Sequence, residues 1–311
     1  MNPSISIIIP IYNEEGNLIP FFESIIRHCK DLHIEIIAVD DGSTDRTPDE
    51  LSRAAKDDAR IKVVRLKRNF GQTAALAAGI DHSSGEIIIP IDGDGQNDPA
   101  DIPLLLRKLD EGYDVVSGWR KDRKDKFISR VLPSLFANKL ISSVTGVRLH
   151  DYGCSLKAYR RSILTGIQLN GEMHRFLPAW CVWQGGKVAE IHVKHHARTK
   201  GKSKYGIFRT FKVVVDLITL KFFSGYLAKP NYLFSGTGFV FLILGGASAA
   251  FAIFDKFGPD RFSKLRIPLL LLAVFFGLGA IFLVLMGLLA ELLTRLYFQV
   301  RHQKPYRLMN E

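Results

Sequence analysis

The fold of this chain is decided by one stretch, Glu86-Ile87-Ile88-Ile89-Pro90-Ile91-Asp92-Gly93-Asp94-Gly95-Gln96-Asn97-Asp98. Its β-branched run has no polar alternation, which predicts a strand that is buried on both faces. The strand ends in an acidic turn (residues 92–96), where Asp92, Asp94 and Gln96 can converge on one cation. Such oxygen ligands, completed by phosphate oxygens, suit Mg²⁺ or Mn²⁺. We therefore predict a metal and diphosphate site at the end of this strand.

The acidic turn has two other interpretations. An isolated Asp-Gly-Asp-Gly sequence is often a simple polar turn, so only its context can decide. A calcium-binding loop fits poorly, because Asn97 stands where such a loop needs a glycine and Pro103 where it needs a glutamate.

The context is an alternation of strand-like and helix-like segments. The expected strands before the acidic turn are residues 4–9, 34–39 and 61–66, and two of the expected helices are 18–29 and 73–80. This order predicts an α/β domain with a mostly parallel sheet, in which ligands bind beyond the carboxyl ends of the strands. Polar residues follow three of these ends, and they are Tyr12, Asn13 and Glu14, then Asp40 and Asp41, then Asp92 and Asp94.

Several function classes are disfavoured. No G-x-G-x-x-G follows the first strand and no P-loop motif occurs, which argues against a dinucleotide-binding oxidoreductase and a P-loop enzyme. The three cysteines lack the spacing of a zinc site or a disulfide framework, which fits a reducing compartment. The N-terminus shows no cleavable signal peptide, so we expect the N-terminal domain in the cytosol.

The formal net charge of +11 is concentrated late in the chain. Residues 120–126 are densely charged, and Arg130 follows in an amphipathic segment, so this region is either a solvated helix face or a group of arginines that meets an anionic head group. The strongest basic run is residues 195–206. It has too few interleaved aromatic residues for base stacking, so we favour a loop over a phosphate-rich donor and expect no nucleic acid.

The C-terminal third predicts attachment to a membrane. Residues 207–228 mix cations with apolar residues, as a helix in the membrane interface does. Residues 232–254 and 268–290 carry no charge and are long enough to cross a bilayer, with Pro268 in a first-turn position. Two crossings return the chain to its starting side, where positive-inside bias prefers the basic tail.

Five motifs in this order resemble family 2 glycosyltransferases with the GT-A fold. They are Pro10-Ile11-Tyr12-Asn13-Glu14-Glu15, Asp40-Asp41-Gly42-Ser43-Thr44-Asp45, Asn69-Phe70-Gly71, Asp92-Gly93-Asp94-Gly95-Gln96 and Gly201-Lys202-Ser203-Lys204-Tyr205. The basic loop and paired spans resemble the polyprenyl-phosphate branch, namely dolichyl-phosphate mannose synthase and, closer, the bacterial two-span undecaprenyl-phosphate glucosyltransferases. The resemblance implies a Rossmann-like GT-A domain (1–206), interfacial helices (207–230), a transmembrane hairpin (231–296) and a basic cytosolic tail (297–311).

The same resemblance implies roles for individual residues. The nucleotide sugar would be bound by Pro10, Tyr12, Glu14, Asp40, Asp41, Asp92, Arg198, Lys202, Ser203 and Lys204. The acceptor phosphate would be bound by Arg120, Arg130 and Ser134, and the charged run adds Arg123 as a further candidate. Asp94 and Gln96 would ligate Mg²⁺ or Mn²⁺, and the catalytic set would be Asp92, Asp94, Gln96, Arg120 and Arg130. The segment 172–175 does not clearly supply the general base found in many relatives.

The implied activity is metal-dependent, inverting transfer of a hexose, with glucose from UDP-glucose as our best expectation and GDP as the other nucleotide considered, to a polyprenyl phosphate. Such an enzyme would be an integral protein of the bacterial cytoplasmic membrane with its catalytic domain on the cytosolic side. Two alternatives stay open: a processive polysaccharide synthase and a catalytically idle lipid-binding scaffold. The sequence also leaves a homo-oligomer open, and it does not fix the sugar, the nucleotide or the lipid length.

Overall fold

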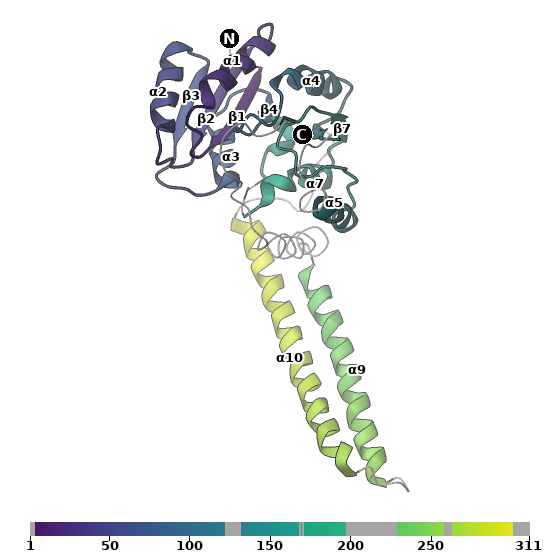
Figure 1. Ribbon diagram of the computed structural model, residues 1–311. Coiled ribbons are helices and arrows are strands. Elements are labelled where there is room, and N and C mark those ends of the chain that lie inside the picture. The colour runs from purple at the N-terminus through teal and green to yellow at the C-terminus, as the bar shows by residue number, and fades with distance from the viewer. Residues whose placement is uncertain are drawn as a thin grey trace. The chain divides into compact units, whose positions relative to one another are not determined.

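The computed structural model describes residues 4–121, 132–167, 169, 171–196, 229–257 and 263–300. The chain divides into two compact units, Met1–Leu217 and Ile218–Glu311, and each is described by itself. The first is an α/β domain, and the described part of the second consists of two long helices (Figure 1).

The α/β domain is built on a seven-stranded sheet with the order β3-β2-β1-β4-β6-β5-β7. Strand β6 runs antiparallel to β4 and β5, while the other neighbouring pairs are parallel. This confirms the mostly parallel sheet that the alternating pattern predicted. The strands are β1 (Ile5–Ile11), β2 (Ile34–Asp40), β3 (Ile61–Arg65), β4 (Ile87–Pro90), β5 (Val115–Trp119), β6 (Lys157–Arg160) and β7 (Val188–His192).

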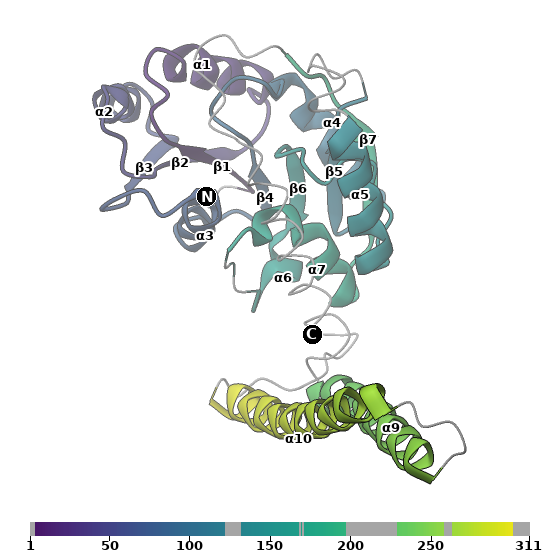
Figure 2. The same cartoon turned by 60° about the horizontal axis from the view of Figure 1, so that its bottom comes forward.

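Both faces of the sheet are covered by helices, as Figure 2 shows. Because successive strand residues point to opposite faces, Ile7 and Ile9 of β1 enter one core while Ile8 enters the other. The first core is closed by α1 (Leu18–His28), α2 (Thr47–Asp57) and α4 (Ile102–Asp110). The second is closed by α3 (Gln72–Asp81), α6 (Arg161–Leu164) and α7 (Leu177–Trp183). The remaining elements among the described residues of the domain are α5 (Leu132–Thr145), η1 (Pro99–Asp101) and η3 (Met173–Arg175).

This topology brings the predicted polar clusters to one edge. Strand β1 lies between β2 and β4, and all three run parallel. Ile11 pairs with Asp40, and Ile8 pairs with Pro90, so the carboxyl ends of the three strands meet. Gly93 packs against β1, because an added Cβ would lie 3.3 Å from the side chains of both Ile9 and Ile11. The acidic turn is therefore seated directly on the end of β1.

One expectation for this domain was wrong. The polar, glycine-marked residues 150–161 have the composition expected of a loop beside the site, but Lys157–Arg160 forms β6 in the interior of the sheet. Ala158 and Tyr159 are buried, which is the packing that a short interior strand requires. Because charged residues stand at both ends of these four residues, the strand has no apolar pattern that a sequence could reveal.

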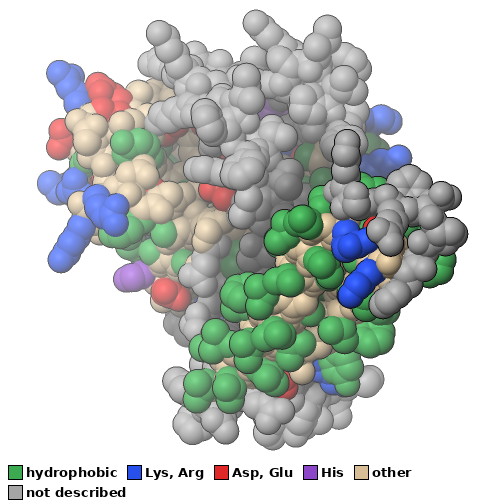
Figure 3. Space-filling view, turned by 90° about the horizontal axis from the view of Figure 1, so that it is seen from below, with side chains coloured by type: hydrophobic (Ala, Val, Ile, Leu, Met, Phe, Trp, Pro, Cys, Tyr) green, Lys and Arg blue, Asp and Glu red, His purple; other side chains and the backbone are tan. Residues whose placement is uncertain are grey.

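The second unit contains α9 (Pro230–Phe257) and α10 (Ser263–Val300). Both are long and apolar enough to cross a membrane, over Pro230–Lys256 and Leu265–Thr294. Their apolar side chains are largely exposed, as Phe239 (62%) and Leu271 (66%) illustrate, and Figure 3 shows a broad hydrophobic area. Pro268 lies inside α10 and not in its first turn, because the helix starts five residues earlier, at Ser263.

Candidate active site

Asp92 lies where side chains from several segments of the chain meet. Its Oδ1 accepts a hydrogen bond of 2.7 Å from Nε2 of Gln72, the first residue of α3. Burial and the nearby charge of Asp94 raise the pKa of Asp92 to about 6, against the opposing effects of a Ser155 hydrogen bond and the positive charges of Arg120 and Lys157. Contacts from three separate parts of the chain therefore set the environment of this carboxylate.

The acidic turn offers ligands for a divalent cation. Asp94 Oδ1 accepts a 3.1 Å hydrogen bond from the backbone N of Gln96, which keeps these two residues in one tight turn. Among the described residues, no group of three or more His, Cys, Asp or Glu side chains is arranged to hold a metal. Two carboxylates and an amide leave coordination positions for phosphate oxygens and water, which is the arrangement that Mg²⁺ prefers. The donor set therefore fits a cation shared with a substrate.

The turn is fixed from its other side by residues 194–196. The backbone N of His196 donates to the carbonyl of Gln96 at 2.8 Å, and His195 forms an isolated β-bridge with Asn97. His196 Nε2 lies 3.2 Å from Asp98 Oδ2. The start of the basic run that the sequence singled out is thus attached to the acidic turn.

The loops after β1 and β2 are joined to each other. Thr44 N donates to Asn13 Oδ1 at 2.8 Å, and Glu14 N donates to Thr47 Oγ1 at 2.9 Å. Pro10 is the sixth residue of β1, and Tyr12 follows the strand directly. The structure therefore brings two of the predicted nucleoside-binding clusters together.

Asp40 and Asp41 are both buried and bound within the protein. Asp40 Oδ1 accepts from Ser43 N at 2.9 Å. The carboxylate of Asp41 accepts from the backbone N atoms of Phe70 and Gly71 at 2.7 and 2.9 Å. These carboxylates shape the loops of the edge, and Asp41 ties the Asn69-Phe70-Gly71 motif to the end of β2.

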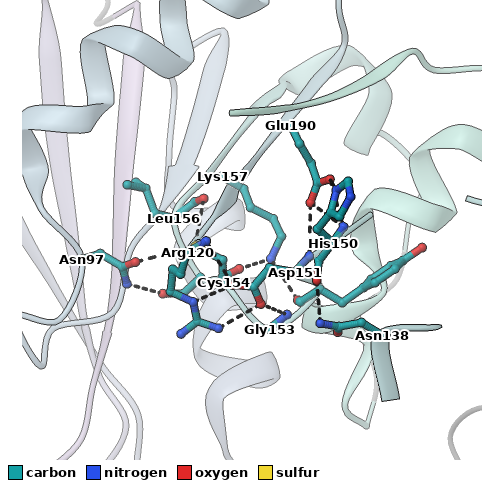
Figure 4. A network of polar contacts seen from close by, with 12 residues as sticks. Asn97, Arg120, Asn138, His150, Asp151, Gly153, Cys154, Leu156, Lys157 and Glu190 are labelled. Carbon is teal, nitrogen blue, oxygen red and sulfur yellow. Dashed lines mark hydrogen bonds and ion pairs between the residues drawn. The ribbon is translucent and has the colours of Figure 1, made fainter. Parts of the chain in front are cut away.

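A second polar network surrounds Arg120, which follows β5 (Figure 4). Its guanidinium forms a bidentate ion pair with Asp151, with Nε–Oδ2 at 2.7 Å and Nη2–Oδ1 at 3.0 Å. Lys157, also buried, donates from Nζ to the carbonyls of Tyr152 and Cys154, and burial lowers its pKa. The positive charges of Arg120 and Lys157 both act on Asp92 and oppose the rise in its pKa.

The segment 172–175 gives no clear general base. Glu172 pairs with Arg175 at 3.3 Å, and His174 Nδ1 lies 2.7 Å from Thr73 Oγ1 on α3. This contact attaches η3 to the first turn of α3, next to Gln72.

Several predicted residues lie outside the described part of the chain. They are Arg123, Arg130, Arg198, Lys202, Ser203 and Lys204. Ser134 belongs to α5 by its backbone, but its side chain is outside the description. The expected interfacial helix at 207–228 and the tail residues 301–311 are outside it as well.

Four residues of the site were not predicted: Gln72, Asp151, Ser155 and Lys157. Gln72 directly follows a recognised motif, which was a usable signal. The other three belong to the polar segment 150–161, whose spacing assigns no role, because contacts across the sheet decide which side chains reach the site.

Residues 6–167 match the family described as Glycosyl transferase family 2. The chain belongs to this family and is a glycosyltransferase. The resemblance inferred from its motifs is therefore confirmed.

Curated relatives align over nearly the whole chain. A dodecaprenyl-phosphate galacturonate synthase from Rhizobium johnstonii is 43% identical, over 95% of this chain and 89% of that protein. An undecaprenyl-phosphate 4-deoxy-4-formamido-L-arabinose transferase from Edwardsiella ictaluri is 36% identical, over 98% and 93%.

Solved structures agree with the GT-A fold. Glucosyl-3-phosphoglycerate synthase from Mycobacterium tuberculosis, in complex with Mg²⁺ and UDP, has a TM-score of 0.55 and 21% identity over 70% of this chain and 79% of that one. A complex of the same enzyme with Mn²⁺, UDP and glucosyl-3-phosphoglycerate gives 0.54 and 19%, over 70% and 80%.

Proposed function

We propose that this chain transfers a sugar from a nucleotide sugar to the phosphate of a polyprenyl phosphate. The observation that carries the proposal is that one loop joins the acidic turn to Arg120, because Ser155 accepts from Asn97 at 2.8 Å and Asp151 pairs with Arg120 at 2.7 Å. The names of the two relatives, which specify sugar transfer to dodecaprenyl and undecaprenyl phosphate, support this choice of acceptor.

The chemistry suits a site without a clear general base. A phosphate monoester has its second pKa at about 6, so its oxygen is largely ionised at neutral pH and can attack unaided. That oxygen forms a bond to the anomeric carbon, the bond from this carbon to the diphosphate breaks, and the configuration inverts. The nucleoside diphosphate leaves with the electron pair.

The main obstacle is repulsion between two anions. Unit charges about 4 Å apart repel by about 4 kcal/mol at an effective dielectric of about 20. In this proposal Arg120, Arg123, Arg130 and Ser134 bind the acceptor phosphate, so that the positive charges oppose the repulsion. Mg²⁺ or Mn²⁺, held by Asp94 and Gln96, would supply charge to the leaving diphosphate.

The nucleoside would lie over the joined loops of β1 and β2. Pro10, Tyr12 and Glu14 would line this position, with Asp40 and Asp41 shaping it from below. Arg198, Lys202, Ser203 and Lys204 would bind the diphosphate. Among the nucleotides we favour UDP over GDP, because the solved neighbours contain UDP.

Glucose stays our proposal for the sugar, as the motif resemblance implied, although the relatives carry galacturonate and formamido-arabinose in their names. We further propose that α9 and α10 span the bacterial cytoplasmic membrane, with the α/β domain on the cytosolic side. The acceptor's head group would then meet the site at the membrane surface.

The test is a transfer assay with the purified full-length protein in lipid nanodiscs. Undecaprenyl phosphate is incubated with a panel of UDP- and GDP-sugars and Mg²⁺ or Mn²⁺, and lipid products are identified by mass spectrometry. We expect one sugar per lipid phosphate, and no product from undecaprenol, which lacks the phosphate. A polymer would instead indicate a processive synthase, and donor binding without any transfer would indicate an idle scaffold.

A further inference from the structure

The guanidinium of Arg120 is held by a single carboxylate. Asp151 accepts from Nε and Nη2 with separate oxygens, and its Oδ2 lies 3.3 Å from the backbone N of Arg120 as well. The side chains of Arg120 and Asp151 are only 11% and 3% exposed. Because a guanidinium is planar, this pairing fixes its orientation and leaves Nη1 as the nitrogen that Asp151 does not bind.

Asp151 is itself held in place by Glu190 of β7. The backbone N of Asp151 donates to Glu190 Oε1 at 3.2 Å, and the backbone N of His150 donates to both Glu190 oxygens at 2.9 Å. Asp151 Oδ1 also accepts from Gly153 N at 3.1 Å. A chain of contacts therefore runs from the edge strand of the sheet to Arg120.

The loop that contains Asp151 also contacts Asn97, the residue directly after the acidic turn. Asn97 Nδ2 donates to Ser155 Oγ at 2.8 Å, and Lys157 Nζ binds the carbonyls of Tyr152 and Cys154 from within (Figure 4). Residues 150–157 thus connect Arg120 to the acidic turn. They therefore set the distance between the guanidinium of Arg120 and the carboxylates of that turn.

We infer that Asp151 is a positioning residue, which presents the Nη1 side of Arg120 to an anionic oxygen of the acceptor phosphate, with Glu190 as its support. The inference rests on the proposed function. An arginine that is oriented before binding loses little conformational entropy when a phosphate arrives. The carboxylate also compensates a cation that would be costly to bury alone.

The test is the Asp151→Asn variant, which keeps the shape but removes the charge. We expect the KM for undecaprenyl phosphate to rise about tenfold or more, as loss of a charge-assisted contact implies. The dissociation constant of the variant for UDP, measured by calorimetry, should stay within about twofold of the wild-type value. Glu190→Gln should move the same KM in the same direction by a smaller factor, and it serves as the second variant if Asp151→Asn does not fold.

A matched control is Asp58→Asn. Asp58 pairs with Arg60 through the same bidentate geometry, at 3.0 and 2.6 Å, in the turn before β3. This variant should leave both constants unchanged.

A double-mutant cycle separates positioning from a merely structural ion pair. If Asp151 acts through Arg120, adding Asp151→Asn to Arg120→Lys should raise the acceptor KM by much less than it does alone. An unchanged acceptor KM, an equal loss of nucleotide binding, or additive effects in the cycle would overturn the inference. Absence of transfer by the wild-type protein in the same assay would instead overturn the proposed function.

Discussion

At the scale of single residues, Asp94 should be indispensable for transfer. Asp94→Asn removes the charge of the proposed metal ligand while it keeps the side-chain shape, so we expect loss of detectable transfer and at least about a tenfold weaker affinity for Mn²⁺. Transfer is checked with the lipid assay and Mn²⁺ affinity by electron paramagnetic resonance titration. The control is Asp110→Asn, which changes an exposed carboxylate at the end of α4. Near-normal turnover by Asp94→Asn would refute the metal assignment.

Gly42 should be equally sensitive, for a steric reason. It has φ +72°, and an added Cβ would lie 2.5 Å from the backbone carbonyl carbon of Arg68. Gly42→Ala should push residues 68–71 away from Asp41, and we expect a loss of about 2 kcal/mol or more in unfolding free energy.

The matched control for this variant is Gly71→Ala. Gly71 also has positive φ, at +95°, but nothing lies within 4 Å of its added Cβ. Thermal unfolding of both variants in detergent measures the difference. Equal destabilisation would show that backbone strain alone, and not the contact with Arg68, makes Gly42 necessary.

At the scale of secondary-structure elements, Glu35 stabilises the amino-terminal edge of the sheet, opposite the site. Burial alone would raise its pKa, but hydrogen bonds from Lys62, Ser6 and Ser84 outweigh burial and lower the pKa to about 2. A depressed carboxyl pKa stabilises the fold at pH values above the unfolded-state value of 4.5, and this stabilisation is lost as the pH falls toward about 2.

Glu35→Gln should therefore cost the most unfolding free energy at neutral pH, about 2 kcal/mol. The difference from wild type should shrink between about pH 4.5 and pH 2. Chemical denaturation at a series of pH values checks this. A difference that does not depend on pH would mean that packing, rather than the ionised carboxylate, is responsible.

Helices α9 and α10 pack closely at glycine positions. A Cβ at Gly279 would lie 2.8 Å from the ring of Phe241, whereas nothing lies within 4 Å of a Cβ at Gly277 on the same helix. Gly279→Val should therefore lower the melting temperature of the hairpin in detergent, and Gly277→Val should not. Equal melting temperatures for the two variants would contradict this packing.

At the scale of the whole molecule, the proposed orientation in the membrane is open to direct test. The three cysteines are all buried, so labelling by a maleimide that cannot cross membranes should have low background. A cysteine at Asp260, between the two helices, should be labelled in intact spheroplasts. A cysteine at the exposed Asp110 should be labelled only after the membrane is opened. The reverse pattern would place the α/β domain on the outer side.

How much of this protein the sequence determines differs between its parts. The strands β1, β2 and β4 are rich in β-branched apolar residues and end in polar clusters, so local pattern alone predicted the sheet edge with Tyr12, Asp40 and Asp92. The two apolar spans were equally evident, because length and absence of charge are local properties. Both predictions depend on periodicity and composition within a single segment.

The tertiary structure alone decided what surrounds Asp92. Strand β6 carries charge at both ends and is recognisable only by its place between β4 and β5. The pairing of Arg120 with Asp151 joins residues 31 positions apart, and that of Asn97 with Ser155 joins residues 58 apart. Hydrogen bonds and ion pairs of this kind depend on distances of a few ångströms across the folded chain, and spacing along a sequence does not contain such distances.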